Sequence, residues 1–315
     1  MKYSIGIDMG GTTTKIGLFS AYGTMISETE IPTRSALGRD VLFQDMADAV
    51  LKLTAEQGVS MDDCTVGMGV AGPVEEDGYV EGLVNLNQYD LYPGRELSQR
   101  LHGIPVAVGN DATVAALGEM WQGSGKGHKS LLFVTLGTGV GGGVVVNGKV
   151  ISGCHGLGGE IGHIWVNPDE PERCNCGGHG CLDQMASATG IVRNAKRFLA
   201  KEQGESSLRA IGNLTAKDVF DAAKAGDSIA VKTIDYCMGF LGKAIADICY
   251  VIDPEMVVLG GGLSKAGQYL LDVVYRHYDY YPRLSRYRSE FALAQLGNHA
   301  GMYGAAKLAL DMQEQ

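Results

Sequence analysis

The chain has 315 residues, of which 45% are hydrophobic and 20% are charged. At about 100–200 residues per domain, this length predicts two domains with ordinary cores and excludes a disordered protein. The 36 acidic and 26 basic residues give a net charge of −10, which argues against DNA, RNA and anionic membranes as partners. An anionic nucleotide is not excluded, because backbone N–H groups and a metal ion can hold phosphates locally.

No signal peptide is expected, because Asp8 interrupts the first apolar run before a hydrophobic region of the required length forms. The longest charge-free stretch, 131–148, contains six glycines and two threonines, which indicates two strands and a turn rather than a membrane helix. The protein is therefore expected to be cytoplasmic. In that compartment its seven cysteines are free thiols or metal ligands rather than disulfides.

The first half of the chain alternates short apolar runs with turns and helical patterns. Strands are expected at 3–7 and 15–19 around a glycine turn at 8–13, with a third strand after the turn at 21–24. A helix at about 39–57 and strands at 65–71 and 104–108 follow, and a further helix begins at Ala112.

The opening pattern then returns at an offset of about 127 residues. A strand at 131–136, a glycine turn at 137–143, a return strand at 144–146 and a hairpin into 149–151 repeat it. Later segments are a helix over 228–253, a buried strand at 256–259 and a last helix from about 301 to 311. The repeat predicts two similar α/β domains that face each other across a cleft.

Three glycine-rich turns follow apolar strands, at 8–13, 137–139 and 260–262. The run from Gly137 to Gly142 matches a dinucleotide fingerprint, but strand rather than helix follows it, so we reject that interpretation. Gly123 to Gly127 resembles a P-loop but lacks its first glycine and its final Ser or Thr. Glycine lets backbone N–H groups approach phosphate closely, and an Asp at the first turn can organise Mg²⁺ through water.

Asn110 and Asp111 stand at the carboxyl end of a predicted strand and open a helix. Open α/β sheets bind ligands at this edge, although both residue types are also ordinary helix N-caps. In a phosphotransferase, Asp111 would accept the proton of the attacking hydroxyl group.

Three cysteines within eight residues, Cys174, Cys176 and Cys181, lie downstream of His163. Three thiolates and an imidazole match a closed tetrahedral Zn²⁺ site that stabilises a loop with little core of its own. Spacing alone also allows His179, and less readily His155, as the fourth ligand. Cys237 and Cys249 are expected in the core, on the apolar face of the long helix.

Two sets of motifs resemble known families. The segment Asp8-x-Gly10-Gly11-Thr12-x-x-Lys15 is similar to the first phosphate motif of the actin-like ATPase and sugar kinase superfamily. Gly158 to His163, followed by the cysteine cluster, resembles the signature of the ROK (repressor, open reading frame, kinase) family. The resemblance covers residues 4 to about 309, and the motifs around Asn85, Asn110 and Ala186 are most similar to bacterial ROK glucokinases.

The resemblance implies an α/β, actin-like ATPase (ribonuclease H-like) fold that is duplicated around a central cleft. It also implies ATP-dependent phosphorylation of a hexose at its 6-hydroxyl, with glucose as the first candidate substrate. It implies a small domain at 1–112 completed by a C-terminal helix at 302–315, a large domain at 113–301 with a zinc loop, and a homodimer. Asp111 would be the catalytic base, and the sugar would contact Gly72, Asn85, Asn110, Glu160, His163 and Asp183. ATP with Mg²⁺ would lie among Asp8, Gly10, Gly11, Thr12, Thr13, Lys15, Thr138, Gly139, Gly261 and Gly262. Structural Zn²⁺ would be held by His163, Cys174, Cys176 and Cys181, since His163 can also face the sugar.

The chain departs from the family pattern at Asp183, where the family usually has a sugar-contacting Glu two residues after the last zinc cysteine. A side chain one methylene shorter shifts the sugar or reaches it through water. This weakens the choice of glucose over N-acetylmannosamine, fructose, allose or a β-glucoside, and polyphosphate stays open as an alternative donor.

Two functions other than that of a kinase are also compatible with this family resemblance. ROK repressors share this body but carry a DNA-binding segment ahead of the first phosphate motif, whereas here Asp8 lies eight residues from the start of an acidic chain. A catalytically silent sugar sensor would need a damaged catalytic set, yet Asp8, Asn110, Asp111 and Glu160 are all present.

Overall fold

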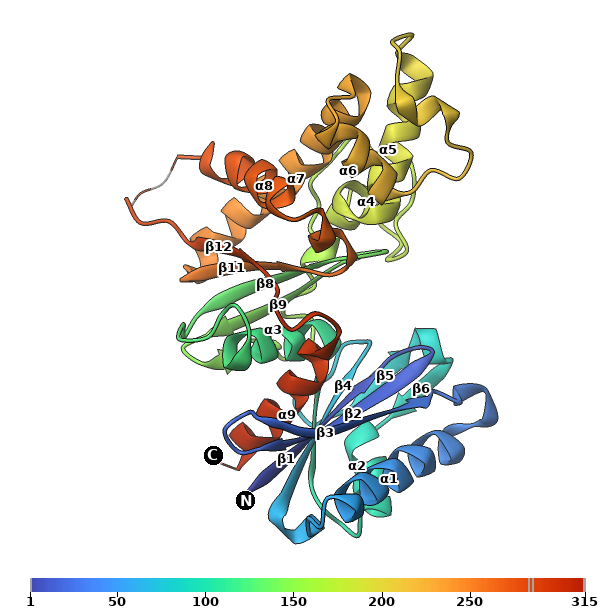
Figure 1. Cartoon of the computed structure of the whole chain (residues 1–315), viewed down its shortest axis with the longest axis vertical. Coiled ribbons are helices and arrows are strands. Elements are labelled where there is room, and N and C mark those ends of the chain that lie inside the picture. Colours follow the sequence, from blue (N-terminus) through green and yellow to red (C-terminus); the bar gives the residue numbers. More distant parts are fainter. Residues whose placement is uncertain (1, 283, 285, 314–315) are drawn as a thin grey trace. The chain divides into compact units, whose positions relative to one another are not determined.

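The computed structural model describes residues 2–282, 284 and 286–313 (Figure 1). Its first sheet has the strand order β3-β2-β1-β4-β7. Strands β1 (Tyr3–Met9), β2 (Thr13–Ser20) and β3 (Met25–Pro32) form an antiparallel meander, and β4 (Cys64–Val70) and β7 (Val106–Asn110) continue the sheet in parallel with β1. The predicted strands and the first glycine turn are therefore confirmed.

Side-chain alternation along β1 gives the first sheet two different faces. Ile5 and Ile7 join an apolar core with α1 (Arg39–Glu56), while α2 (Pro93–Arg100) packs against α1 and β7. The opposite face is covered by α9 (Ala300–Met312), which also packs against α3 (Asp111–Gln122) (Figure 1).

Glycines on the second face let helix α9 approach the strands directly. A Cβ atom at Gly6 would lie 1.9 Å from the Met302 carbonyl oxygen, and one at Gly67 would lie 1.9 Å from the Ala305 carbonyl oxygen. Ser4 Oγ donates to the Ala306 carbonyl at 2.7 Å, so the C-terminal helix is part of the first sheet's packing. A small two-stranded sheet of β5 (Val80–Leu83) and β6 (Gln88–Leu91) adds to this region.

The second sheet repeats the topology of the first, with the order β10-β9-β8-β11-β12. Its strands are β8 (Leu131–Leu136), β9 (Val140–Val146), β10 (Lys149–Val150), β11 (Met256–Gly260) and β12 (Glu290–Leu293). The predicted duplication is confirmed. The predicted turn at 137–143 is shorter, because β9 begins at Val140. A Cβ atom at Gly143 would lie 2.6 Å from the Ala112 carbonyl oxygen, so this glycine lets β9 pack closely against the start of α3.

Helices follow the second glycine turn along the chain: α4 (Leu182–Ala186), α5 (Ala188–Lys201), α6 (Ala216–Lys224), α7 (Ser228–Ile252) and α8 (Gln268–Asp279). Helix α7 packs against the other four and buries Cys237 and Cys249, as predicted. Among the described residues, none of the helices has the length and apolar character needed to cross a bilayer.

The chain divides into two compact units. The first comprises Met1–Leu131, Gly143–Gly159 and Gln295–Gln315, and the second comprises Leu132–Gly142 and Glu160–Ala294. The domain boundaries expected from the sequence, 1–112 with 302–315 and 113–301, stay a prediction.

Candidate functional site

Two carboxylates lie together at the carboxyl edge of the first sheet. The parallel register aligns Asp8 with Gly69 and Gly69 with Gly109, so β1 and β7 end at the same edge. Strand β7 ends at Asn110, and α3 begins at Asp111. The fold therefore brings Asp8 and Asp111, which are 103 positions apart in the sequence, to one place.

Burial changes the acidity of both carboxyl groups. It raises the pKa of Asp8 to about 6, with a further rise from the charge of Asp111 and an opposing effect from Lys15. Burial also raises the pKa of Asp111, while a backbone hydrogen bond from Ala112 lowers it. A carboxylate whose pKa is shifted toward neutrality is suited to accept a proton in catalysis.

Asn110 has the ordinary capping role that its sequence position allowed, and a second contact besides. Its Oδ1 accepts hydrogen bonds from the N–H groups of Ala112 at 3.0 Å and Thr113 at 3.1 Å. Its Nδ2 donates to the Gly72 carbonyl at 3.2 Å. Asn110 thus fixes the start of α3, where Asp111 stands, and joins it to the segment after β4.

The first glycine turn lies next to these groups and is held by backbone contacts. Gly10 N donates to the Thr13 carbonyl at 3.1 Å. A Cβ atom at Gly11 would lie 3.8 Å from Asn85 Cβ, so the predicted sugar-site residue Asn85 stands beside this turn. Lys15 pairs with Asp8 in the β1–β2 register, and Thr12 lies in the turn between them.

Sequence reasoning missed Gly301, which supports Asp8 from helix α9. A Cβ atom at Gly301 would lie 2.6 Å from the carboxyl carbon of Asp8, so only glycine leaves room for the carboxylate. No local motif marks this glycine, because its partner is almost 300 residues away in the sequence.

In the second unit, two glycine turns meet at the ends of β8 and β11. Gly261 has φ of +78°, and a Cβ atom there would lie 2.5 Å from the Leu136 carbonyl oxygen. Gly262 follows and begins a short 3-10 helix. The start of α5 holds the turn at 137–139, because Ala188 N donates to the Gly137 carbonyl at 2.8 Å and Thr189 Oγ1 to the Thr138 carbonyl at 2.5 Å.

Glu160, His163 and Asp183 belong to the same unit. His163 N donates to the Glu160 carbonyl at 3.1 Å in a short helical turn. Asp183 Oδ1 accepts a hydrogen bond from Val140 N at 2.6 Å. The residue that departs from the family pattern is therefore bonded to the backbone directly after Gly139, a contact that sequence reasoning did not anticipate.

Four side chains of the second unit form a group that fits a metal ion. The ligand atoms of His163, Cys174, Cys176 and Cys181 all lie within 4.8 Å of one another. The sulfurs of Cys176 and Cys181 are 3.6 Å apart, and Cys174 Sγ lies 3.8 Å from His163 Nδ1. Zn–S bonds of about 2.3 Å in a tetrahedron place sulfurs about 3.8 Å apart, so the donor set fits Zn²⁺. His163 rather than His179 belongs to this group of described residues.

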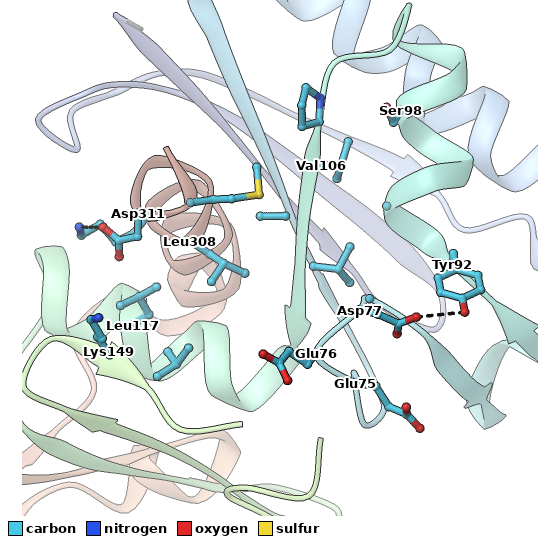
Figure 2. A pocket seen from close by; sticks show the side chains of 18 of the residues that line it. Glu75, Glu76, Asp77, Tyr92, Ser98, Val106, Leu117, Lys149, Leu308 and Asp311 are labelled. Atoms are coloured by element: carbon cyan, nitrogen blue, oxygen red, sulfur yellow. Dashed lines mark hydrogen bonds and ion pairs between the residues drawn. The ribbon is translucent and has the colours of Figure 1, made fainter. Parts of the chain in front are cut away.

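A cavity of about 940 Å³ lies elsewhere in the first unit (Figure 2). Its described lining comes from α2, β7, the end of α9 and the β9–β10 hairpin, with Glu75, Asp77, Lys149 and Asp311 among its charged groups. None of the residues predicted for the sugar, nucleotide or metal is among those lining residues. We therefore base the candidate site on the carboxylates and glycine turns rather than on this cavity.

The model of one protein family, the ROK family, matches residues 4–312. The chain belongs to the ROK family. A glucokinase of Halalkalibacterium halodurans is 42% identical to it over 98% of the chain and 94% of the relative. A glucokinase of Thermotoga maritima is 34% identical over 96% of both.

Solved structures give the same grouping. A ROK family glucokinase from Streptomyces griseus, in complex with glucose and AMPPNP, has a TM-score of 0.77 at 31% identity and is matched over 98% of this chain and 99% of its own. The ROK hexokinase from Thermus thermophilus has a TM-score of 0.83 at 30% identity, over 99% and 100% of the two chains. The ROK chain described here therefore has the α/β, actin-like ATPase fold predicted from its motifs.

Proposed function

We propose that this ROK protein transfers the γ-phosphoryl group of ATP to the 6-hydroxyl of a hexose, with glucose as the first candidate. The glucokinases to which the chain is similar support this reaction. The observation that carries the proposal is Asp111, a carboxylate with a raised pKa directly after the carboxyl end of β7, next to Asp8.

In the proposed reaction, Asp111 accepts the proton of the sugar hydroxyl while the hydroxyl oxygen bonds to the γ-phosphorus. The bond from that phosphorus to the bridging oxygen breaks, and ADP leaves. Asn110, held by its bonds to α3 and to Gly72, would orient a neighbouring hydroxyl with its remaining amide hydrogen. Gly72, Asn85, Glu160, His163 and Asp183 would complete the sugar contacts.

The nucleotide would be held by residues of the glycine turns. The residues expected to contact it are Asp8, Gly10, Gly11, Thr12, Thr13, Lys15, Thr138, Gly139, Gly261 and Gly262. Mg²⁺ bound with ATP neutralises charge on the phosphates when present. Asp8 is the carboxylate of this set and would hold the ion through water.

Zn²⁺ would be a structural ion bound by His163, Cys174, Cys176 and Cys181. Three thiolates and one imidazole leave no open position for a reacting group, which is typical of a structural site. The ion would fix the ring of His163, and its second nitrogen would face a sugar hydroxyl.

A cytoplasmic location and a homodimer are also part of this proposal. Both rest on the sequence arguments and on the family resemblance. Light scattering coupled to size-exclusion chromatography tests the dimer, since a mass of one chain at micromolar concentration would contradict it.

The experiment that tests the function is an ADP-release assay across a panel of sugars. The panel contains glucose, N-acetylglucosamine, N-acetylmannosamine, fructose, allose and a β-glucoside, each with ATP and with polyphosphate as the donor. We expect glucose with ATP to give the highest kcat/KM. A preferred amino sugar would correct the substrate, and the absence of release with every sugar would overturn the kinase proposal.

A further inference from the structure

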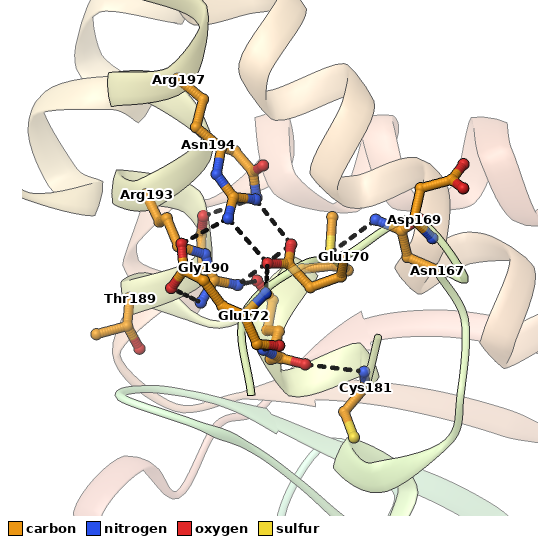
Figure 3. Close-up of polar contacts among 12 residues, drawn as sticks. Asn167, Asp169, Glu170, Glu172, Cys181, Thr189, Gly190, Arg193, Asn194 and Arg197 are labelled. Atoms are coloured by element: carbon orange, nitrogen blue, oxygen red, sulfur yellow. Dashed lines mark hydrogen bonds and ion pairs between the residues drawn. The ribbon is translucent and has the colours of Figure 1, made fainter. Parts of the chain in front are cut away.

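A cluster of carboxylates and guanidinium groups lies in the second unit, near the metal-binding residue Cys181 (Figure 3). We call the residues 163–181 the metal loop, and the group Glu170, Glu172, Arg193 and Arg197 the loop clamp. The two glutamates belong to the metal loop. The two arginines lie four residues apart on α5, so they project from the same face of that helix.

Glu170 is the centre of the loop clamp. Its side chain is 0% exposed, and its two carboxylate oxygens accept hydrogen bonds from Arg197 at 2.7 and 2.8 Å. Glu170 Oε1 also accepts a bond from the N–H of Glu172 at 3.1 Å. This two-point guanidinium contact holds the pKa of Glu170 below its ordinary value, so the carboxylate stays charged.

The loop clamp continues to the segment just before the first metal cysteine. Arg197 donates to Glu172 at 2.6 Å, and Arg193 donates to the second oxygen of Glu172 at 3.3 Å. Glu172 stands two residues before Cys174. Both arginines of α5 therefore hold the entry to the cysteine segment.

Gln184 connects the loop clamp to another metal-binding residue. Its Oε1 accepts a hydrogen bond from Cys181 N at 3.2 Å, and its Nε2 donates to the Glu172 carbonyl at 3.0 Å. Arg193 donates to the carbonyl of Gln184. The backbone on both sides of the cysteine cluster is thus tied to one helix.

The same helix holds the second glycine turn with its first residues. Ala188 and Thr189, at the start of α5, bond to the Gly137 and Thr138 carbonyls. The first residues of helix α5 therefore contact the glycine turn proposed to bind phosphate. Arg193 and Arg197, further along the same helix, contact the metal loop.

We propose that the Glu170–Arg197 pair is a positioning device for the metal, holding the metal loop in its ligating geometry so that the ion leaves slowly. This inference rests on the metal site of the proposed function. Loss of residues that orient metal ligands typically lowers metal affinity about 10–100-fold, and we expect an effect of that size.

The test measures zinc release from the purified full-length protein in the absence of sugar and nucleotide. The variants are Glu170→Gln, Arg197→Gln and the double variant, with zinc content measured by mass spectrometry and release followed with a chromogenic chelator. We expect release about 10–100-fold faster in each single variant. The double variant is expected to release zinc at a rate close to that of the singles, because the two side chains act as one unit.

The matched control is Arg276→Gln. It removes an exposed arginine, with 63% of its side chain accessible, from a pair with Asp235 in the same unit. Its release rate is expected to stay within about twofold of the wild type, as for a typical surface pair. Arg197→Lys keeps the charge but loses the two-point contact, and is expected to give an intermediate rate. If Arg197→Gln does not fold, Arg197→Lys replaces it as the test of the Arg197 contact.

A second readout separates positioning from a purely structural role. Zinc binding raises Tm by an amount set by its affinity, so this rise is expected to shrink in the Glu170 and Arg197 variants. An equal fall in Tm with and without zinc, together with unchanged release, would overturn the inference while leaving the metal site intact. A wild-type protein that binds no zinc would overturn the metal site itself and this inference with it.

Discussion

The two copies of the strand–turn–strand unit share one topology but differ in their charge. At the offset of about 127 residues, Asp8 corresponds to Thr135 and Lys15 to Gly142, so the second copy lacks both charged residues. The first turn carries its carboxylate in its own strand. The second receives one from α4, because Asp183 bonds to the N–H of Val140.

This comparison shows how a duplicated fold can be used for two different tasks. In the first copy, the half-buried carboxylate of Asp8, whose pKa is raised, stands where a phosphate-bound cation is expected. In the second copy, the turn offers mainly backbone groups, and its shape is set by contacts from Asp183, Ala188 and Thr189.

Removing the charge of Asp111 has the largest expected effect on turnover. Asp111→Asn is expected to lower kcat at least about 100-fold, the lower end for loss of a general base, while the Kd for sugar changes little. ADP release gives kcat, and titration calorimetry gives the Kd. Asp62→Asn, at an exposed aspartate of the same unit, is the control. Normal turnover in Asp111→Asn would exclude the assigned role.

Removing zinc tests the second unit through its predicted sugar contact. Because His163 belongs to the group of metal ligands, the metal-free protein is expected to show a sugar KM about 10-fold higher or more. This change corresponds to the loss of one hydrogen bond to a charged group. The Kd for nucleotide should stay within about twofold, since the phosphate turns have other supports. Unchanged sugar KM in demonstrably zinc-free protein would refute the coupling.

The raised pKa of Asp8 predicts a particular dependence of stability on pH. Its value is about 6 in the folded protein against 3.8 in the unfolded chain, so the native state binds more protons between these values. Stability therefore falls as pH rises from about 4 to about 6 and stays lower above.

Asp8→Asn removes the unfavourable free energy of keeping Asp8 ionised in the folded protein. In urea unfolding at pH 7.5, the variant should therefore be about 1–3 kcal/mol more stable than the wild type. The difference should shrink toward pH 4. Asp62→Asn should show no such trend, and a constant difference across this range for Asp8→Asn would contradict the assignment.

Corresponding glycines of the two turns should respond differently to alanine. A Cβ atom at Gly10 would lie 2.8 Å from the Thr13 carbonyl oxygen, whereas one at Gly137 meets no described atom within 4 Å. We expect Gly10→Ala to lower the free energy of unfolding by about 1–2 kcal/mol and Gly137→Ala to change it by less than about 0.5 kcal/mol. The measurement is urea unfolding without ligands, and equal effects would show that the turns are equivalent.

The smallest expected effect concerns the contact that Asp183 makes with the second turn. Asp183→Ala removes the acceptor for Val140 N and is expected to cost about 1 kcal/mol of stability. Asp183→Asn keeps an acceptor oxygen and should cost clearly less. If Asn and Ala cost the same, the hydrogen bond does not stabilise the turn.

Local sequence patterns predicted the elements whose side chains alternate or repeat at regular spacing. The strands around both glycine turns, the long helix and the burial of Cys237 and Cys249 follow from alternation and helical spacing. The sequence patterns do not predict helices α2, α4, α5, α6 and α8. In α5, the two arginines that hold the metal loop find their partners more than 20 residues away, which no local pattern reveals.

The candidate site also contains residues that the sequence predicted and contacts that it did not. The cysteine cluster was predictable from spacing, and the structure groups it with His163 rather than His179. The bond of Asp183 to Val140 and the room that Gly301 leaves for Asp8 depend on contacts between distant segments. The roles of the site residues in binding sugar and nucleotide stay predictions that the assays above address.

The close seating of α9 on Gly6, Gly67 and Ser4 has a consequence for synthesis on the ribosome. Ser4 leaves the exit tunnel well before its carbonyl partner, Ala306, which follows 302 residues later. One face of the first sheet is therefore without its helix while the intervening residues are translated, and such long-range contacts form slowly. The nascent first unit is thus an expected client of chaperones until α9 is made.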